Sequence, residues 1–223
     1  MNKSVAESFV VLALNPDKGR ISINSINFRY SLTGALLMDY YEQGEFTIEN
    51  KRIVPSFKKN GETVHDLFCE RIMKSEKNRR ISFWISRMTN KSRKIFRELI
   101  NKLEKDRIIR KEQKKFLNII PYYRYWFNDS SVRSDLIETL RGILLYGKQP
   151  GKKELMLLGL VETSKSYTLL SRESGESKLL RKKNTEFLKS DIISAEISRA
   201  MREVQAAIVA SVTAATIATH SSH

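Results

Sequence analysis

The sequence predicts a mainly α-helical fold, a single compact domain over residues 1–223 with a central helix bundle and small β-hairpins. Three observations predict it. Apolar residues recur at helical spacing along most of the chain. Gly, Pro and Asn interrupt these segments, but no linker is long enough to separate domains. The composition, with 41% hydrophobic and 29% charged residues, is typical of a globular protein.

Two helices and a hairpin are predicted before residue 60, and a third helix follows them. The apolar run over 4–14 predicts a helix, which a turn cluster from Asn15 to Gly19 ends. After an extended segment over 20–23, Asn24 or Ser25 caps a second helix that ends at Gly44. The remaining predictions are strands over 45–48 and 52–57, then a helix after Gly61 bearing Val64, Leu67, Phe68 and Ile72.

The middle of the chain is predicted to form two helices and a second hairpin. Ile81, Trp84 and Met88 have helical spacing, and we assign Trp84 to the core. Ile95 opens an apolar stripe that recurs every four residues in the next helix. Two strands, 107–110 and 115–120, are expected to pair around a turn at 111–114, and the aromatic segment 122–127 follows the hairpin.

The C-terminal third is predicted to be helical throughout. Asp129 and the serines after it cap a helix that Gly147 ends. The segment Leu155 to Val161 is apolar on all sides, which predicts a buried helix. A helix over roughly 179–188 precedes the last one, which runs from near Asp191 to near Thr219. The last helix is rich in alanine in its second half, which we expect at the crowded centre of the bundle.

The positive charge is concentrated in one part of the chain. The net charge is +15, and residues 51–150 hold 25 basic and 11 acidic side chains, a net charge of +14. Such asymmetry indicates a basic surface that meets a polyanion, either nucleic acid or an anionic membrane. The sequence has no run of about 20 apolar residues. With one cysteine and no signal-peptide pattern, a cytoplasmic location is expected.

The sequence contains little that predicts catalysis. His65 and Cys69 are four residues apart and share a helix face, but a Cys–His site also needs an orienting partner and an oxyanion donor. Glycine-rich phosphate loops and metal-ligand clusters are absent. We therefore expect a protein that is not an enzyme and has no cofactor or metal, with a site at His65 and Cys69 as the catalytic alternative.

Several segments, in order, resemble the Golgi phosphoprotein 3 family. They are LALNPDKGRISI, SLTGALLMDYYEQGEF, Trp84, the stretch 95–116, KKELMLLGLVETSKSY and the alanine-rich final helix. The chain looks like a bacterial member. The resemblance implies a mostly helical peripheral membrane protein, because eukaryotic members bind phosphatidylinositol 4-phosphate and the cytosolic tails of glycosyltransferases.

The resemblance also implies where headgroups bind. The lipid-reading positions of the family fall on four residues of this chain: Asn24, Thr33, Arg93 and Phe96. Only Arg93 matches the family residue, although Arg97 shares its helix face at i, i+4. Arg29 approaches them if the second helix lies alongside. Arg93, Arg97 and Arg29 are the candidate headgroup ligands, and this set favours general anionic-lipid binding over reading of one phosphoinositide.

The second membrane element of the family is an apolar hairpin tip that inserts among lipids. It corresponds here to Phe116, Leu117, Asn118 and Ile119, followed by Ile120. The flanking basic residues, Lys114, Lys115 and Arg124, suit lipid headgroups. The nearby aromatic residues, Tyr122, Tyr125 and Trp126, suit a membrane interface. For Trp126 and Phe127, burial behind the hairpin is an equal alternative.

The leading hypothesis is a non-catalytic peripheral membrane protein. Its expected partners are an anionic phospholipid surface and the tails of membrane proteins. The alternative is a nucleic-acid-binding protein, because residues 78–120 also fit a winged helix-turn-helix with Arg93, Lys94 and Arg97 facing phosphates. The sequence leaves the oligomeric state open.

Overall fold

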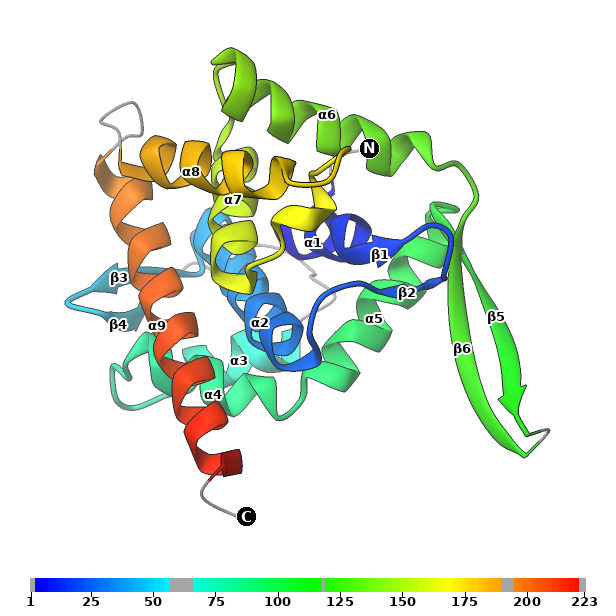
Figure 1. Ribbon diagram of the computed structural model, residues 1–223. Coiled ribbons are helices and arrows are strands. Elements are labelled where there is room, and N and C mark those ends of the chain that lie inside the picture. Colours follow the sequence, from blue (N-terminus) through cyan, green and yellow to red (C-terminus); the bar gives the residue numbers. More distant parts are fainter. Residues whose placement is uncertain (1–2, 57–65, 118, 190–194, 221–223) are drawn as a thin grey trace.

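Helix α1 (Val5–Ala13) lies at the centre of the fold in the computed structural model, which describes residues 3–56, 66–117, 119–189 and 195–220 (Figure 1). Every residue of α1 is buried, and the helix contacts α2, α5, α6 and α7. A mostly apolar sequence suits a helix that others surround, and its one charged residue, Glu7, pairs with Lys102 of α5. The predicted helical fold with a central bundle is therefore confirmed.

The described residues form helices and three two-stranded ribbons. The other helices are α2 (Ser25–Glu42), α3 (Asp66–Met73), α4 (Ile81–Thr89), α5 (Ser92–Lys105), α6 (Ser131–Tyr146), α7 (Lys152–Ser164), the 3₁₀ turn η1 (Tyr167–Leu169), α8 (Glu176–Lys189) and α9 (Ala195–His220). The ribbons pair β1 (Leu14–Asn15) with β2 (Arg20–Ile21), β3 (Phe46–Glu49) with β4 (Arg52–Pro55), and β5 (Ile109–Phe116) with β6 (Ile120–Phe127), all antiparallel.

Most of the predicted elements lie where the sequence placed them. Asn24 caps α2, because its side chain accepts a hydrogen bond from the Ile26 N–H at 3.0 Å. The segment Leu155 to Val161 is buried within α7, and Trp84, only 6% exposed, belongs to the core. The predicted residues Gly61 and Val64 lie outside the described residues.

A buried carboxylate from α2 caps the central helix. Asp39 accepts hydrogen bonds from the backbone N–H groups of Val5, at 2.6 Å, and Ala6, at 3.0 Å. The Ser4 hydroxyl accepts the Glu7 N–H and completes a capping box. Burial raises the pKa of Asp39 from 3.8 to about 6, because loss of hydration outweighs the two N–H donors.

This raised pKa predicts a specific pH dependence of stability. Between the unfolded pKa of 3.8 and the folded pKa of about 6, the folded protein binds a proton on Asp39 that the unfolded chain releases. The contribution of Asp39 to the free energy of unfolding is therefore complete below pH 3.8 and is lost as the pH rises through 6. In urea unfolding at a series of pH values, the wild type should lose up to about 3 kcal/mol relative to Asp39→Asn across this window. Parallel pH profiles of the two proteins would contradict this cause.

Glycines allow α9 to lie close to its neighbours. A Cβ added to Gly34 of α2 would lie 2.4 Å from the Ile208 Cδ1, and one added to Gly159 of α7 would lie 2.3 Å from the Gln205 Nε2. The expectation that the second half of α9 lies at the crowded centre holds around Gln205 and Ile208, which meet these glycines, but it is wrong beyond Ser211. Beyond Ser211 most described side chains of α9 are exposed, because the helix extends past α2 and along α4 (Figure 1).

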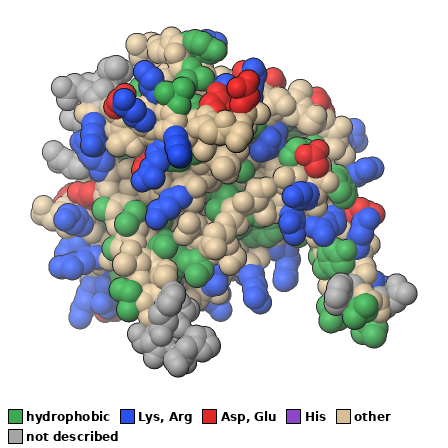
Figure 2. All heavy atoms as spheres, in the orientation of Figure 1, with side chains coloured by type: hydrophobic (Ala, Val, Ile, Leu, Met, Phe, Trp, Pro, Cys, Tyr) green, Lys and Arg blue, Asp and Glu red, His purple; other side chains and the backbone are tan. Residues whose placement is uncertain are grey.

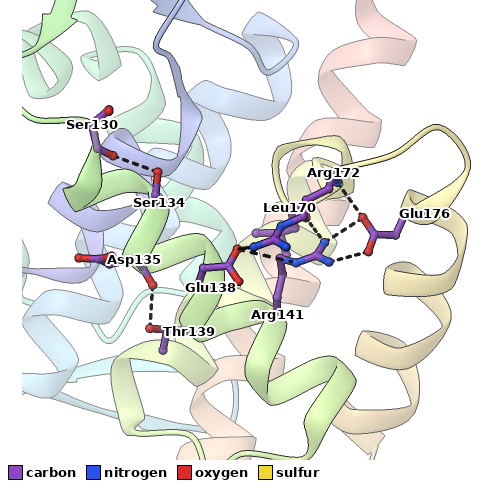
Figure 3. A network of polar contacts seen from close by, with 9 residues as sticks. All are labelled: Ser130, Ser134, Asp135, Glu138, Thr139, Arg141, Leu170, Arg172 and Glu176. Atoms are coloured by element: carbon purple, nitrogen blue, oxygen red, sulfur yellow. Dashed lines mark hydrogen bonds and ion pairs between the residues drawn. The ribbon is translucent and has the colours of Figure 1, made fainter.

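A polar network joins α6 to the start of α8 (Figure 3). The buried Arg141 guanidinium forms two hydrogen bonds with the Glu176 carboxylate, at 2.7 and 2.8 Å, and donates to the Leu170 carbonyl at 2.7 Å. Glu138 pairs with Arg172 at 2.6 Å. The hydrogen bonds from Arg141 lower the pKa of Glu176 to about 2, so this carboxylate is ionised at neutral pH.

Candidate functional site

The second predicted hairpin is present, but its turn lies elsewhere. β5 and β6 pair from Ile109 opposite Phe127 to Phe116 opposite Ile120, so the expected turn at 111–114 is wrong. The aromatic segment 122–127 belongs to the second strand of the hairpin, whereas we expected it to follow the hairpin. The polar residues 111–114 favour a turn by composition, but much of this ribbon is exposed, so polar residues continue the strand β5 here. Figure 1 shows the ribbon standing out from the helices.

The root of the ribbon is packed on the helices by a ladder of aromatic rings. Phe9 of α1 stacks on Phe28 of α2 with ring centroids 5.9 Å apart. Phe28 meets Phe96 of α5, and Phe96 meets Tyr125 of β6, each edge to face at 5.6 Å. This ladder links the central helix to the ribbon, and it fixes the direction in which the ribbon leaves the body.

The turn between β1 and β2 covers the other side of the root. The Gly19 carbonyl accepts the Tyr125 N–H at 2.9 Å, and the Trp126 ring lies against the Gly19 backbone. The Trp126 indole N–H donates to Glu112 at 2.7 Å. Trp126, Tyr125 and Phe127 are all half-buried here, so they help to hold the root of the ribbon; a membrane-interface role for Tyr125 and Trp126 stays a prediction.

Gly19→Ala is expected to loosen the root of the ribbon. Gly19 has φ +58°, and an added Cβ would lie 3.2 Å from the Trp126 ring and from the Arg124 Cβ. The left-handed backbone alone costs about 1–2 kcal/mol for a residue with a Cβ. The free energy of unfolding and the hydrogen-exchange protection of the Tyr125 amide should both fall.

Gly147→Ala is the matched control, because Gly147 has φ +65° and nothing lies within 4 Å of its added Cβ. It should destabilise the protein without changing the Tyr125 amide. Equal exchange at Tyr125 in both variants would contradict a contact specific to Gly19.

The tip of the ribbon is apolar and exposed. The exposed fractions are 75% for Leu117, 78% for Ile119, 60% for Ile120 and 51% for Tyr123. At about 3.4 Å per residue, Ile120 lies about 17 Å along the strand from the anchored Tyr125. The side chain of Phe116 and all of Asn118 lie outside the described residues. In Figure 2 the tip shows a group of apolar side chains below a cluster of Lys and Arg.

Leu117 has an unusual backbone for its residue type. Its φ is +48°, in the left-handed region that Gly and Asn adopt more readily. Neither turn geometry nor packing favours leucine there, because the side chain is mostly exposed. The leucine is therefore exposed in a backbone conformation that costs about 1–2 kcal/mol for a residue with a Cβ.

Basic side chains follow the ribbon from tip to root. Lys114 pairs with Glu112 at 3.2 Å, and Lys111 pairs with Glu104 of α5 at 2.9 Å. Arg110 and Lys115 are exposed, and neither forms an ion pair within the described part of the chain. The apolar tip is therefore followed directly by cations.

The three candidate arginines lie around the first half of α5. Arg29 of α2 donates to the Ser92 hydroxyl at 2.9 Å and to the Thr89 carbonyl at 3.2 Å, which places it where α4 meets α5. Arg93 is the next residue after Ser92, and Arg97 lies one turn further; both are exposed. Burial raises the pKa of Tyr125, and the charge of Arg97 opposes that rise, so this arginine also acts on the root of the ribbon.

The other family positions have structural roles in this chain. Thr33 is fully buried; its hydroxyl donates to the Arg29 carbonyl at 3.0 Å and lies 3.1 Å from the Thr89 hydroxyl. Asn24 caps α2, and Phe96 belongs to the aromatic ladder. None of the three supplies a cation.

The structure adds no support for the catalytic alternative at His65 and Cys69. His65 lies outside the described residues, and Cys69 is buried in α3. Among the described residues, no three His, Cys, Asp or Glu side chains are grouped as metal ligands would be. Within the same residues, every helix is too short or too polar to cross a membrane.

Fold and site together define a class: a helical domain that presents an apolar-tipped ribbon beside a basic helix. The sequence matches the family model described as Golgi phosphoprotein 3 (GPP34) over residues 5–208, so the chain belongs to this family. Comparison with curated proteins found no significant match.

Proposed function

We propose that this protein is a non-catalytic peripheral membrane protein that binds anionic phospholipid headgroups at a cytoplasmic membrane surface. The tip of the β5–β6 ribbon enters the interface, and the cations of the ribbon and of α5 meet the headgroups. Membership of the Golgi phosphoprotein 3 family is consistent with a membrane-associated role. Phosphoinositides are one candidate headgroup, and tails of membrane proteins are candidate partners.

The observation that carries this proposal is the composition of the tip. Three large aliphatic side chains, Leu117, Ile119 and Ile120, are each at least 60% exposed. Transfer of such a side chain out of water contributes about 1.5–3 kcal/mol when burial is complete. Each basic residue near an anionic surface adds about 1 kcal/mol. Apolar and basic contributions together are sufficient for reversible membrane binding.

The nucleic-acid alternative fits the tip less well. α4, α5 and the ribbon follow in the order of a winged helix-turn-helix, and Arg93, Lys94 and Arg97 are exposed on α5. A wing that contacts phosphates needs polar or basic side chains at its end. Here the end carries Leu117 and Ile119 instead.

Co-sedimentation with vesicles tests the proposal. At low salt the protein should bind vesicles of phosphatidylcholine with phosphatidylglycerol, bind pure phosphatidylcholine much less, and dissociate as salt rises. Adding phosphatidylinositol 4-phosphate tests for a headgroup preference. The proposal fails if anionic vesicles do not bind the protein at low salt. A salt-sensitive gel shift with duplex DNA in that case would favour the alternative.

A further inference from the structure

A groove of about 800 Å³ lies between α4 and α9, formed by residues other than those of the ribbon and α5. Its volume is within the usual range for ligand sites. The residues that line it are Arg52, Arg79, Arg80, Ser82, Phe83, Ser86, Arg87, Asn90, Ala210, Ser211 and Ala214. Four of them are arginines.

The backbone holds three of these arginines in place. Arg52 of β4 and Arg80 form an antiparallel bridge, and the Ile53 N–H donates to the Arg79 carbonyl at 2.9 Å. The Arg52 guanidinium donates to the Asn78 carbonyl at 2.8 Å. The bridge extends the β3–β4 ribbon as far as the first residues of α4, so these arginines converge on the groove from two elements.

Among the residues that the structure describes, the four arginines have no acidic counterpart. No Asp or Glu lines the groove, and none of the four forms an ion pair within the described part of the chain. The Arg79 guanidinium lies 5.0 Å from the centre of the Phe83 ring. Like charges gathered on one groove repel each other and attract anions. The planar guanidinium is suited to two-point contacts with carboxylate or phosphate.

The floor of the groove favours a peptide over other anions. Phe83 is 39% exposed, and Ala210 and Ala214 of α9 are exposed small residues, so apolar side chains have a surface to contact. The arginines are exposed, so each contact with an anion is screened, and a ligand that meets several of them at once binds better than one phosphate. Arg79 already covers the Phe83 ring, which a nucleic-acid base would need for stacking.

We propose that the α4–α9 groove binds an acidic peptide segment of a partner protein. Its carboxylates pair with Arg52, Arg79, Arg80 and Arg87, and its apolar side chains contact the alanines of α9 and the part of Phe83 that Arg79 leaves exposed. This interaction uses residues other than those that contact the membrane in the proposed function, so both can occur in one protein.

Fluorescence anisotropy with the full chain and no vesicles tests this site. The probe is a short fluorescein-labelled peptide of alternating Glu and Leu. Binding should saturate, and Arg80→Ser with Arg87→Ser should weaken it about tenfold or more, equivalent to about 1.4 kcal/mol. Serine at the N-cap position of Arg80 favours α4, so the fold is retained. Circular dichroism checks this.

Lys182→Ser with Lys183→Ser is the matched control, because it removes the same charge from exposed positions on α8. It should leave the affinity unchanged, as should Leu117→Ser with Ile119→Ser at the ribbon tip. Binding that does not saturate, or that the α8 control weakens equally, would overturn the proposal. So would a single-stranded oligonucleotide that binds the groove more tightly than the peptide.

Discussion

Leu117→Ser together with Ile119→Ser is expected to lower the partition of the protein onto anionic vesicles by about a hundredfold. The two side chains are 75% and 78% exposed in the folded protein. If each contributes about 1.5 kcal/mol by leaving water, their loss removes about 3 kcal/mol of binding free energy. Vesicle co-sedimentation over a range of lipid concentrations measures this change.

The same substitutions should leave the fold intact. Exposed side chains away from special contacts change the free energy of unfolding by about 0.5 kcal/mol or less. Leu179→Ser with Tyr146→Ser is the matched control, because these residues of α8 and α6 are 48% and 77% exposed. If the control weakens binding as much as the tip variant, general surface hydrophobicity is the cause and the tip has no special role.

Arg93→Glu with Arg97→Glu is expected to weaken binding to anionic vesicles by at least about thirtyfold. Neutralising two cations near an anionic surface costs about 2 kcal/mol, and reversing their charge costs more. The residual binding should also depend less on salt, because fewer ionic contacts remain. Both side chains are exposed, so the thermal unfolding midpoint should change little.

Lipid composition separates this effect from that of the tip. The tip variant should lose affinity for neutral and anionic vesicles alike, whereas the arginine variant should lose it for anionic vesicles only. Lys182→Glu with Lys183→Glu on α8 makes the same change in net charge on another surface. Unchanged anionic binding by the arginine variant would place the headgroup contacts elsewhere on the basic region.

The sequence predicted the helical core well because its signals are local. The apolar run over 4–14, the Asn24 cap and the all-apolar segment from Leu155 to Val161 each determine a helix through neighbours along the chain. The opening helix was placed within a residue or two of α1 for the same reason. That α1 is central, and that Asp39 caps it, depends on contacts between distant segments.

The ribbon was predicted with the wrong turn for a physical reason. Polar residues normally indicate a turn, but in this exposed ribbon they continue the strand β5. The observed turn contains Leu117, which turn preferences do not favour. The aromatic and β-branched residues of 120–127 were the available signal for a strand, because such residues are enriched in strands.

The candidate arginines illustrate what depends on tertiary packing. The spacing of Arg93 and Arg97 along the chain was enough to predict that they share a helix face. The position of Arg29 follows from its hydrogen bonds to Ser92 and Thr89, which form only when α2 packs against α4 and α5. The groove between α4 and α9 was not predicted at all, because its arginines come from a strand, a loop and a helix.

A fluorescent label at the tip tests the central claim most directly. In a Cys69→Ala background, Ile119→Cys is labelled with the environment-sensitive dye NBD, and Thr139→Cys on the exposed side of α6 serves as the reference. With anionic vesicles, emission at the tip should shift to the blue and increase, and emission at position 139 should not change. A protein that co-sediments with these vesicles while the tip label stays in water would contradict insertion of the ribbon.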